Sequence, residues 1–300
     1  MAGEILAGTA SWTDKSLIET KAFYPRGCNS AEGRLRYYAS QFPCVEVDSS
    51  YYAMPSTTNA QLWAERTPDH FLFNVKAFRL FTGHQTPVTA LPKDIQAAMA
   101  THFSKHRMLY YKDTPAEIRG VMWERFTRAL TPLLAAGKLG AIHFQYPPWV
   151  GPNKEGYELL LECRDRLADY LLATEFRLGS WFDDEHKEAT LKFEHDHHFV
   201  HVVLDMPQGF KNSVKRVWAV TNDKMSIVRF HGRNTETWNA RDHKEASDRF
   251  NYAYTRDELA EFIDPIRKLA NSTERVLAIM NVNFGTQGVD AARTLIDLFE

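Results

Sequence analysis

The stretch Leu171-Leu172-Ala173-Thr174-Glu175-Phe176-Arg177 is a short apolar run that ends in a carboxylate and a guanidinium. Seven further runs of this kind lie along the chain, and helix-compatible segments separate them. The eight runs are, in order, Glu4–Thr9, Val45–Asp48, Phe71–Lys76, Ala141–Gln145, Leu171–Glu175, Val200–Asp205, Ser226–His231 and Val276–Asn281. Strand and helix alternating eight times predict an α/β fold in which a parallel sheet closes into a single (β/α)8 barrel.

The chain length fits this architecture. A (β/α)8 barrel typically needs about 250 residues, and the chain has 300, so we expect one domain over residues 1–300 with some inserted segments. Helices are predicted around Ala31–Gln41, Thr58–Glu65, Glu155–Arg166, Asp184–Phe193, Arg256–Ala270 and Val289–Phe299. The second strand is expected to continue through Ser49–Tyr52.

The segment between the third and fourth strands is longer than one crossover helix requires. It contains a helical stretch near Pro92–Phe103, the basic and aromatic stretch His102–Lys112, and a strong helix over Pro115–Ala136. We therefore predict a helical insertion between strands three and four. Long loops on barrels serve as lids or subunit contacts, and a solvated pair of surface helices is the alternative.

Bulk composition excludes several classes of protein. The net charge is −2 and the pI near 6.6, so the chain has no global basic field for long duplex DNA, although a local basic pocket is allowed. The three cysteines have no CxxC spacing, which predicts neither a disulfide framework nor a zinc knuckle. No signal peptide and no membrane-spanning run are recognised. We expect a cytoplasmic protein that does not contact a membrane.

Polar side chains at the strand ends are the candidate site, because a parallel barrel brings those ends to one face. The cations Lys76, Arg177, Arg229 and Arg233 would bind a small anionic ligand, since guanidinium groups fit phosphate and carboxylate. The other candidate ligand contacts are Gln145, Asn281, Trp12 and Trp181. The alternative is a salt-bridge network in which Glu175, Asp205 and Asp48 neutralise the cations.

Three of the same strand ends carry acid–base candidates. Glu175 and His231 are predicted to act as the catalytic acid–base pair, with Asp205 orienting His231 from the adjacent strand. Burial would raise the pKa of Glu175, whereas Arg177 or Lys76 would lower it.

A metal centre is not predicted. The rim has one clear histidine and several cations, and the cations oppose the binding of a metal ion. The histidines in His195–His198 precede the sixth strand and therefore belong to the opposite face of the barrel. No cofactor is favoured, and a divalent cation held by Glu, Asp and His at successive strand ends is the less favoured alternative. The chain has no P-loop, no GxGxxG after a strand and no GxSxG elbow, which weighs against the nucleotide-binding and hydrolase classes that use those motifs. Aromatic residues near the rim suggest a stacking surface for a planar ligand, a sugar or single-stranded nucleic acid.

The whole chain resembles the YecE-like family, domain of unknown function 72. The motifs that carry the resemblance are GTASW at 8–12, FYP at 23–25, EVDSSYY at 46–52, VKA at 75–77, FQYPP at 144–148, EFR…SW at 175–181 and RFHGRN…W at 229–238. The resemblance implies a TIM barrel and supplies no reaction. The chain differs from the family's adjacent asparagines after strand eight, where it has Met280-Asn281-Val282-Asn283.

Together these features predict an enzyme that acts on a phosphate-bearing substrate by acid–base hydrolysis or lyase chemistry. The substrate would be a nucleotide, a sugar phosphate or a nucleic-acid end. A non-catalytic protein that binds an anionic ligand and a metal-dependent nuclease are the alternatives.

Overall fold

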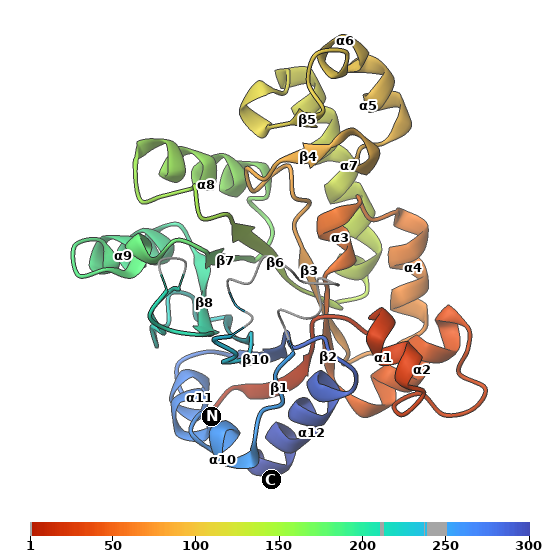
Figure 1. Ribbon diagram of the computed structural model, residues 1–300, viewed down its shortest axis with the longest axis vertical. Coiled ribbons are helices and arrows are strands. Elements are labelled where there is room, and N and C mark those ends of the chain that lie inside the picture. Colours follow the sequence, from red (N-terminus) through yellow and green to blue (C-terminus); the bar gives the residue numbers. More distant parts are fainter. Residues whose placement is uncertain (1, 211–212, 237, 239–250) are drawn as a thin grey trace.

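The computed structural model describes residues 2–210, 213–236, 238 and 251–300. Its centre is a closed barrel in which the strands follow the order β1-β10-β9-β8-β7-β6-β3-β2 (Figure 1). All neighbouring strands pair in parallel. The barrel strands are β1 (Glu4–Thr9), β2 (Cys44–Val47), β3 (Leu72–Lys76), β6 (Leu139–Tyr146), β7 (Leu172–Phe176), β8 (Phe199–Asp205), β9 (Met225–Phe230) and β10 (Arg275–Met280). The predicted (β/α)8 barrel is confirmed.

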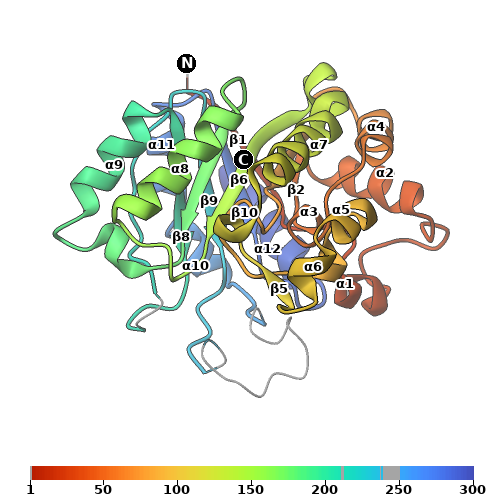
Figure 2. The same ribbon diagram turned by 90° about the horizontal axis from the view of Figure 1, so that it is seen from above.

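Helices surround the barrel, as Figures 1 and 2 show from two directions. They bury apolar faces against the strands, and the strand interiors are almost wholly inaccessible to solvent. The surrounding elements are α1 (Lys15–Thr20), α2 (Ala31–Gln41), α3 (Ser49–Tyr52), α4 (Thr57–Glu65), α8 (Lys154–Arg166), η3 (Gly179–Phe182), α9 (Lys187–Asp196), α10 (Arg256–Ala260), α11 (Ile263–Ala270) and α12 (Gln287–Phe299).

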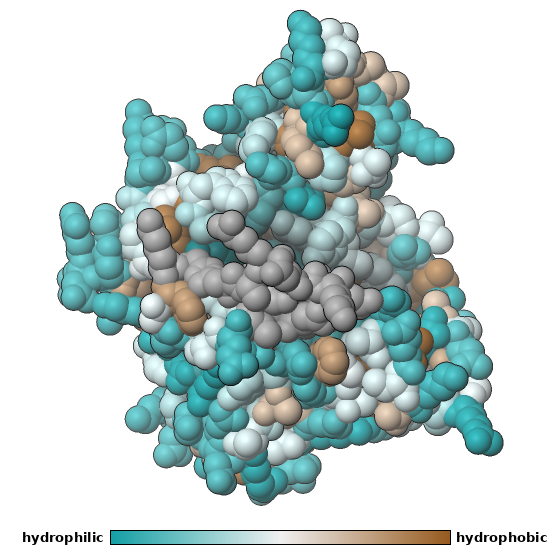
Figure 3. All heavy atoms as spheres, viewed as in Figure 1, coloured by the Kyte–Doolittle hydropathy of each residue, from teal (hydrophilic) through white to brown (hydrophobic). Residues whose placement is uncertain are grey.

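The predicted insertion between β3 and β6 is present and lies at the top of Figure 1, beyond the barrel. Hydrophilic residues cover much of the face seen in Figure 3, including the outer part of the insertion. The insertion comprises β4 (Thr86–Pro87), η1 (Val88–Ala90), α5 (Lys93–Ala98), α6 (Ala100–Phe103), β5 (Met108–Leu109), η2 (Tyr111–Asp113) and α7 (Ala116–Ala135).

Buried contacts fix the insertion to the barrel layer. Trp123 of α7 stacks on Phe81 with ring centroids 3.7 Å apart. The Trp123 indole N–H donates to the Tyr111 hydroxyl at 2.8 Å, and that hydroxyl donates to Glu162 of α8 at 2.6 Å. The insertion is therefore anchored on both sides of the C-terminal rim.

Two local predictions are wrong. Ser49–Tyr52 forms the short helix α3 instead of continuing β2, and the Ser50 hydroxyl lies 2.6 Å from the carbonyl oxygens of Val47 and Lys76. This turn stops the strand and brings Tyr51 back over the barrel mouth. The predicted helix Arg256–Ala270 is divided into α10 and α11. Pro265 explains the division, because it has no N–H to donate to the carbonyl group four residues earlier.

Candidate active site

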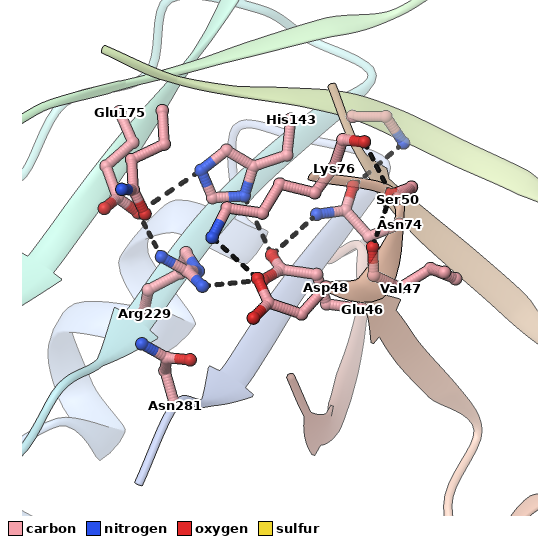
Figure 4. Close-up of polar contacts among 12 residues, drawn as sticks. Glu46, Val47, Asp48, Ser50, Asn74, Lys76, His143, Glu175, Arg229 and Asn281 are labelled. Carbon is pink, nitrogen blue, oxygen red and sulfur yellow. Dashed lines mark hydrogen bonds and ion pairs between the residues drawn. The ribbon is translucent and has the colours of Figure 1, made fainter. Parts of the chain in front are cut away.

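The interior of the barrel contains a layer of polar side chains, and a buried arginine lies at its centre. Arg229 comes from β9, and its guanidinium is wholly inaccessible to solvent. Its Nη2 lies 2.6 Å from Oε1 of Glu46, and its Nη1 forms an ion pair with Oε2 of Glu175. Figure 4 shows the two carboxylates on opposite sides of the guanidinium. Arg229 therefore links β9 to β2 and to β7 across the interior of the barrel.

His143 of β6 contacts the same two carboxylates. Its Nδ1 lies 2.8 Å from Oε2 of Glu46, and its Nε2 lies 3.2 Å from Oε2 of Glu175. Asn74 of β3 adds a donor to Glu46 at 3.3 Å. Burial alone would raise the pKa of Glu46, but Arg229 and His143 outweigh it and hold that pKa far below its usual range.

Glu175 holds a second arginine at the rim. Arg177 Nη2 lies 2.5 Å from Oε1 of Glu175 and donates to Oε1 of Gln145 at 3.0 Å. Burial acts to raise the pKa of Glu175, but Arg177 and then Arg229 lower it well below its ordinary value. Glu175 is therefore ionised at neutral pH, and it positions two guanidinium groups.

His231 follows β9 and is buried beside these arginines. Its Nδ1 lies 2.7 Å from Nδ2 of Asn281, and its Nε2 lies 3.4 Å from an Nη atom of both Arg177 and Arg229. Burial, and then the charge of Arg177, lowers its pKa from 6.5 to about 3. The ring is therefore neutral at physiological pH.

A second group of cations lies at the ends of β2 and β3. Lys76 Nζ forms an ion pair of 2.6 Å with Asp48 and lies 5.0 Å from the centroid of the Tyr51 ring. Arg79 places its guanidinium carbon 5.2 Å from the same centroid. Within the described part of the chain, Arg79 makes no ion pair with a carboxylate, and its buried Nε has no hydrogen-bond partner. Burial, and then Arg79, Lys76 and Arg177, lowers the pKa of His84 to about 3.

The positive charge in this layer exceeds the negative charge. Across the described residues, four cations in or just after β3, β7 and β9 face three carboxylates in or just after β2 and β7. The charge of His143 is not counted. The cations are Lys76, Arg79, Arg177 and Arg229, and the carboxylates are Glu46, Asp48 and Glu175. His84 and His231 add no charge at neutral pH. Among the described residues, this layer therefore has one more cation than it has carboxylates.

Asp205 belongs to a separate group of residues. Its carboxylate pairs with Arg216, accepts from Arg233 Nε at 3.2 Å and from the Tyr254 hydroxyl at 2.5 Å. Its backbone carbonyl oxygen accepts a hydrogen bond from the His231 N–H at 2.8 Å. The carboxylate of Asp205 thus faces Arg216, Arg233 and Tyr254, whereas Asn281 contacts the imidazole ring of His231. Arg233 also pairs with Glu261 at 2.9 Å and so belongs with Asp205.

The chain's relatives match this fold over nearly its whole length. Residues 6–300 match the family described as "Protein of unknown function DUF72". The chain belongs to the DUF72 family. It is 30% identical over 298 residues to the UPF0759 protein YunF of Bacillus subtilis, which covers 99% of this chain and 95% of that protein.

Solved structures of DUF72 proteins show the same architecture. The structure of a DUF72 protein from Enterococcus faecalis V583 matches with a TM-score of 0.79 and 25% identity, over 98% of this chain and 95% of that one. A DUF72 protein from Thermotoga maritima matches with a TM-score of 0.76 and 24% identity, over 98% of both chains. In the described part of this DUF72 chain, none of the helices is long and apolar enough to cross a membrane.

Two tryptophans that were expected to contact a ligand are core residues of the DUF72 barrel. Trp181 is fully buried, donates its indole N–H to the Val150 carbonyl at 2.8 Å, and stacks on Phe176 at 4.1 Å. Trp12 packs edge-on against Trp63 with ring centroids 5.7 Å apart. The exposed rim aromatics are different ones: Tyr52 and Trp149 are each 58% exposed.

Sequence reasoning missed four residues of the site. Glu46, Asn74 and His143 lie inside their strands, one residue or more before the strand end, and Arg79 lies in the loop after β3. The signal for the first three was visible, because each is a polar residue flanked on both sides by apolar ones. A buried polar residue in a strand needs a partner, and in these three strands the partners lie inside the barrel.

The described residues contain no group of three or more histidine, cysteine or acidic side chains that could hold a metal ion. Glu46 and Glu175 converge, but the Arg229 guanidinium lies between them. The two carboxylates that could serve as metal ligands are therefore already paired with a cation, the Arg229 guanidinium.

Proposed function

We propose that this DUF72 protein is an enzyme that binds a phosphate-bearing substrate at the mouth of the barrel. The observation that supports this proposal is the unbalanced positive charge, and above all Arg79, which has no carboxylate partner in the described part of the chain. Arg79, Lys76 and Arg177 surround the Tyr51–His84 pair closely enough to lower the pKa of His84. A phosphate group placed here would supply the missing negative charge.

Binding of the phosphate would also prepare His231 for acid–base chemistry. After burial, the charge of Arg177 is the largest cause of the low pKa of His231. A phosphate on Arg177 neutralises that charge and moves the pKa of His231 toward neutrality, where a general acid or base is most effective. Asn281 orients the ring. The reaction would be hydrolysis or elimination at the phosphate ester.

Replacing Arg79 with methionine tests the anion site. Arg79→Met should weaken the binding of inorganic phosphate by about 1.5–3 kcal/mol, the contribution of a charge-assisted hydrogen bond, or roughly 10- to 150-fold. Unfolding by urea should change little, because no carboxylate loses its partner. Wild-type binding should weaken as salt rises. Arg36→Met, which removes an exposed ion pair with Glu32 on α2, is the matched control. Equal phosphate binding by wild type and Arg79→Met would refute the anion site.

A non-catalytic ligand-binding protein is the second candidate. It is favoured by the resting state of the site, in which Glu175 is ionised and His231 is neutral, so that neither can donate a proton. Release of inorganic phosphate from phosphate monoesters, abolished by His231→Gln, would support the enzyme. Binding without turnover would support the second candidate. Activity that is lost in chelator would instead support the metal-dependent nuclease.

The other features of the proposal concern the protein as a whole. We propose that residues 1–300 form one domain, which one contiguous buried core extending from β1 to α12 supports. A cytoplasmic location and a small anionic ligand are part of the same proposal. Single-stranded nucleic acid is retained as a further partner because its ends carry phosphate.

A further inference from the structure

A groove lies beside the phosphate site, at the same rim of the barrel. It runs between residues 110–113 of the insertion, which include η2, and residues 149–156, which lead from β6 into the first turn of α8, and it encloses about 760 Å³. This volume is typical of sites for small organic ligands. Tyr110 and Trp149 supply aromatic surface, and Lys112, Asp113 and Asn153 supply polar groups.

A row of aromatic rings connects this groove to the cations. Tyr51 lies next to Lys76 and Arg79, with the Lys76 Nζ 5.0 Å from its ring centroid. The Tyr51 and His84 centroids are 5.2 Å apart, and those of His84 and Trp149 are 5.6 Å apart. The groove and the cations are therefore linked by a row of packed rings, in which the middle ring, His84, is buried and Trp149 is exposed.

Trp149 is held in place although much of it is exposed. Its indole N–H donates to the Gly83 carbonyl at 3.1 Å, and its edge packs against His84. More than half of the side chain, 58%, remains accessible to solvent. A large aromatic ring that is fixed at one edge and open on the rest is preorganised for stacking, because little conformational freedom is lost when a ligand binds.

We propose that the site binds a nucleotide, with its phosphate on Lys76 and Arg79 and its base on Trp149 in the groove. This inference rests on the proposed function, because the same cations hold the phosphate. A planar heterocycle fits best for two reasons. The row from Tyr51 to Trp149 presents aromatic rings, and Asp113 and Asn153 at the groove can pair with the amino and carbonyl groups of a base.

The test compares three probes that share the phosphate: AMP, ribose 5-phosphate and inorganic phosphate. Binding is measured by calorimetry for the wild type, Trp149→Ala, Trp149→Phe and the control Trp218→Ala. Trp218 is also partly exposed, at 36%, but lies in the segment between β8 and β9 and lines a different groove. Because both tryptophans are at the surface, circular dichroism should show that each variant folds.

The nucleotide proposal expects AMP to bind about tenfold more tightly than ribose 5-phosphate, the contribution of one stacked base. Trp149→Ala should remove this gain and leave the other two probes unchanged, whereas Trp149→Phe should keep most of it. Equal affinity for AMP and ribose 5-phosphate, or no effect of Trp149→Ala on AMP, overturns the nucleotide while the phosphate site stands. Binding of none of the three probes overturns the phosphate site and the nucleotide together.

Discussion

Removing the guanidinium of Arg229 should destabilise the barrel strongly. In Arg229→Met the carboxylates of Glu46 and Glu175, both wholly buried, lose their shared partner. Breaking one buried ion pair costs about 3–5 kcal/mol, because the remaining charge is left without compensation. Two carboxylates are affected, but His143 contacts both and Arg177 still pairs with Glu175. We therefore expect a loss of about 3–5 kcal/mol and not twice that amount.

Urea unfolding followed by circular dichroism measures this loss. The control is Arg275→Met, since Arg275 forms only an exposed ion pair of 3.7 Å with Glu4 and such pairs contribute about 0–1 kcal/mol. Adding Glu46→Gln and Glu175→Gln to Arg229→Met should recover part of the stability, because no unpaired charge remains. A loss below about 1 kcal/mol in the single variant, with an unchanged m-value, would refute the argument that the guanidinium compensates both carboxylates.

Three further predictions follow from the contacts of the site and core. The pKa of His231 is about 3 in the folded chain against 6.5 in its ordinary state, so between these pH values the unfolded chain binds a proton that the folded chain does not. Stability should therefore fall as the pH drops below 6.5, by up to about 1.4 kcal/mol per pH unit, and His231→Gln should remove this contribution from urea titrations at pH 7, 6 and 5. Arg177→Met should raise the pKa of His231 in an NMR titration, since Arg177 is the charge that lowers it most; an unchanged titration would exclude that coupling. Trp181→Ala should lower the free energy of unfolding by about 3–5 kcal/mol in thermal or urea unfolding, while the affinity for phosphate stays constant. A loss of phosphate affinity of similar size would instead show that Trp181 contributes to ligand binding.

The strands could be predicted from the sequence because each is a short apolar run in a regular alternation. The limits of β1 agree at both ends, and those of the other apolar runs agree within one or two residues, although the expected continuation of β2 through Ser49–Tyr52 was wrong. The two-residue strands β4 and β5 could not be predicted in this way. Their antiparallel pairing depends on contacts within the insertion, and two residues carry no periodicity.

The site was predicted less completely, for a geometric reason. Reading only the residues at or near the end of each run identified Lys76, Glu175 and Arg229 but passed over Glu46 and His143. Successive side chains of a strand point to opposite faces, so the inward residues of one layer come from different positions in different strands. The position of a side chain relative to the barrel axis follows from the register between strands, which one sequence does not display.

Residue types alone also could not decide whether the cations bind an anionic ligand or are neutralised by carboxylates of the chain itself. Both processes use the same side chains, and one layer holds a cation with two carboxylate partners as well as a cation with none among the described residues. Arg229 is fully neutralised by Glu46 and Glu175 in the interior, whereas Arg79 at the rim has no carboxylate partner among the described residues. The deeper cation is thus part of the framework, and the outer one is the cation on which the proposed phosphate site depends.

The energetics of this layer support the proposed ligand site. Barrel interiors are usually filled by branched apolar side chains, and replacing a buried ion network with well-packed apolar residues often leaves stability unchanged or increases it. A barrel therefore needs no buried ring of Glu46, His143, Glu175 and Arg229 in order to fold. What the ring does supply is rigid support, because Glu175 is held by Arg229 and in turn holds Arg177 at the rim. A guanidinium fixed in this way loses little freedom when an anion binds, so the cost of the buried charges is offset by a preorganised site.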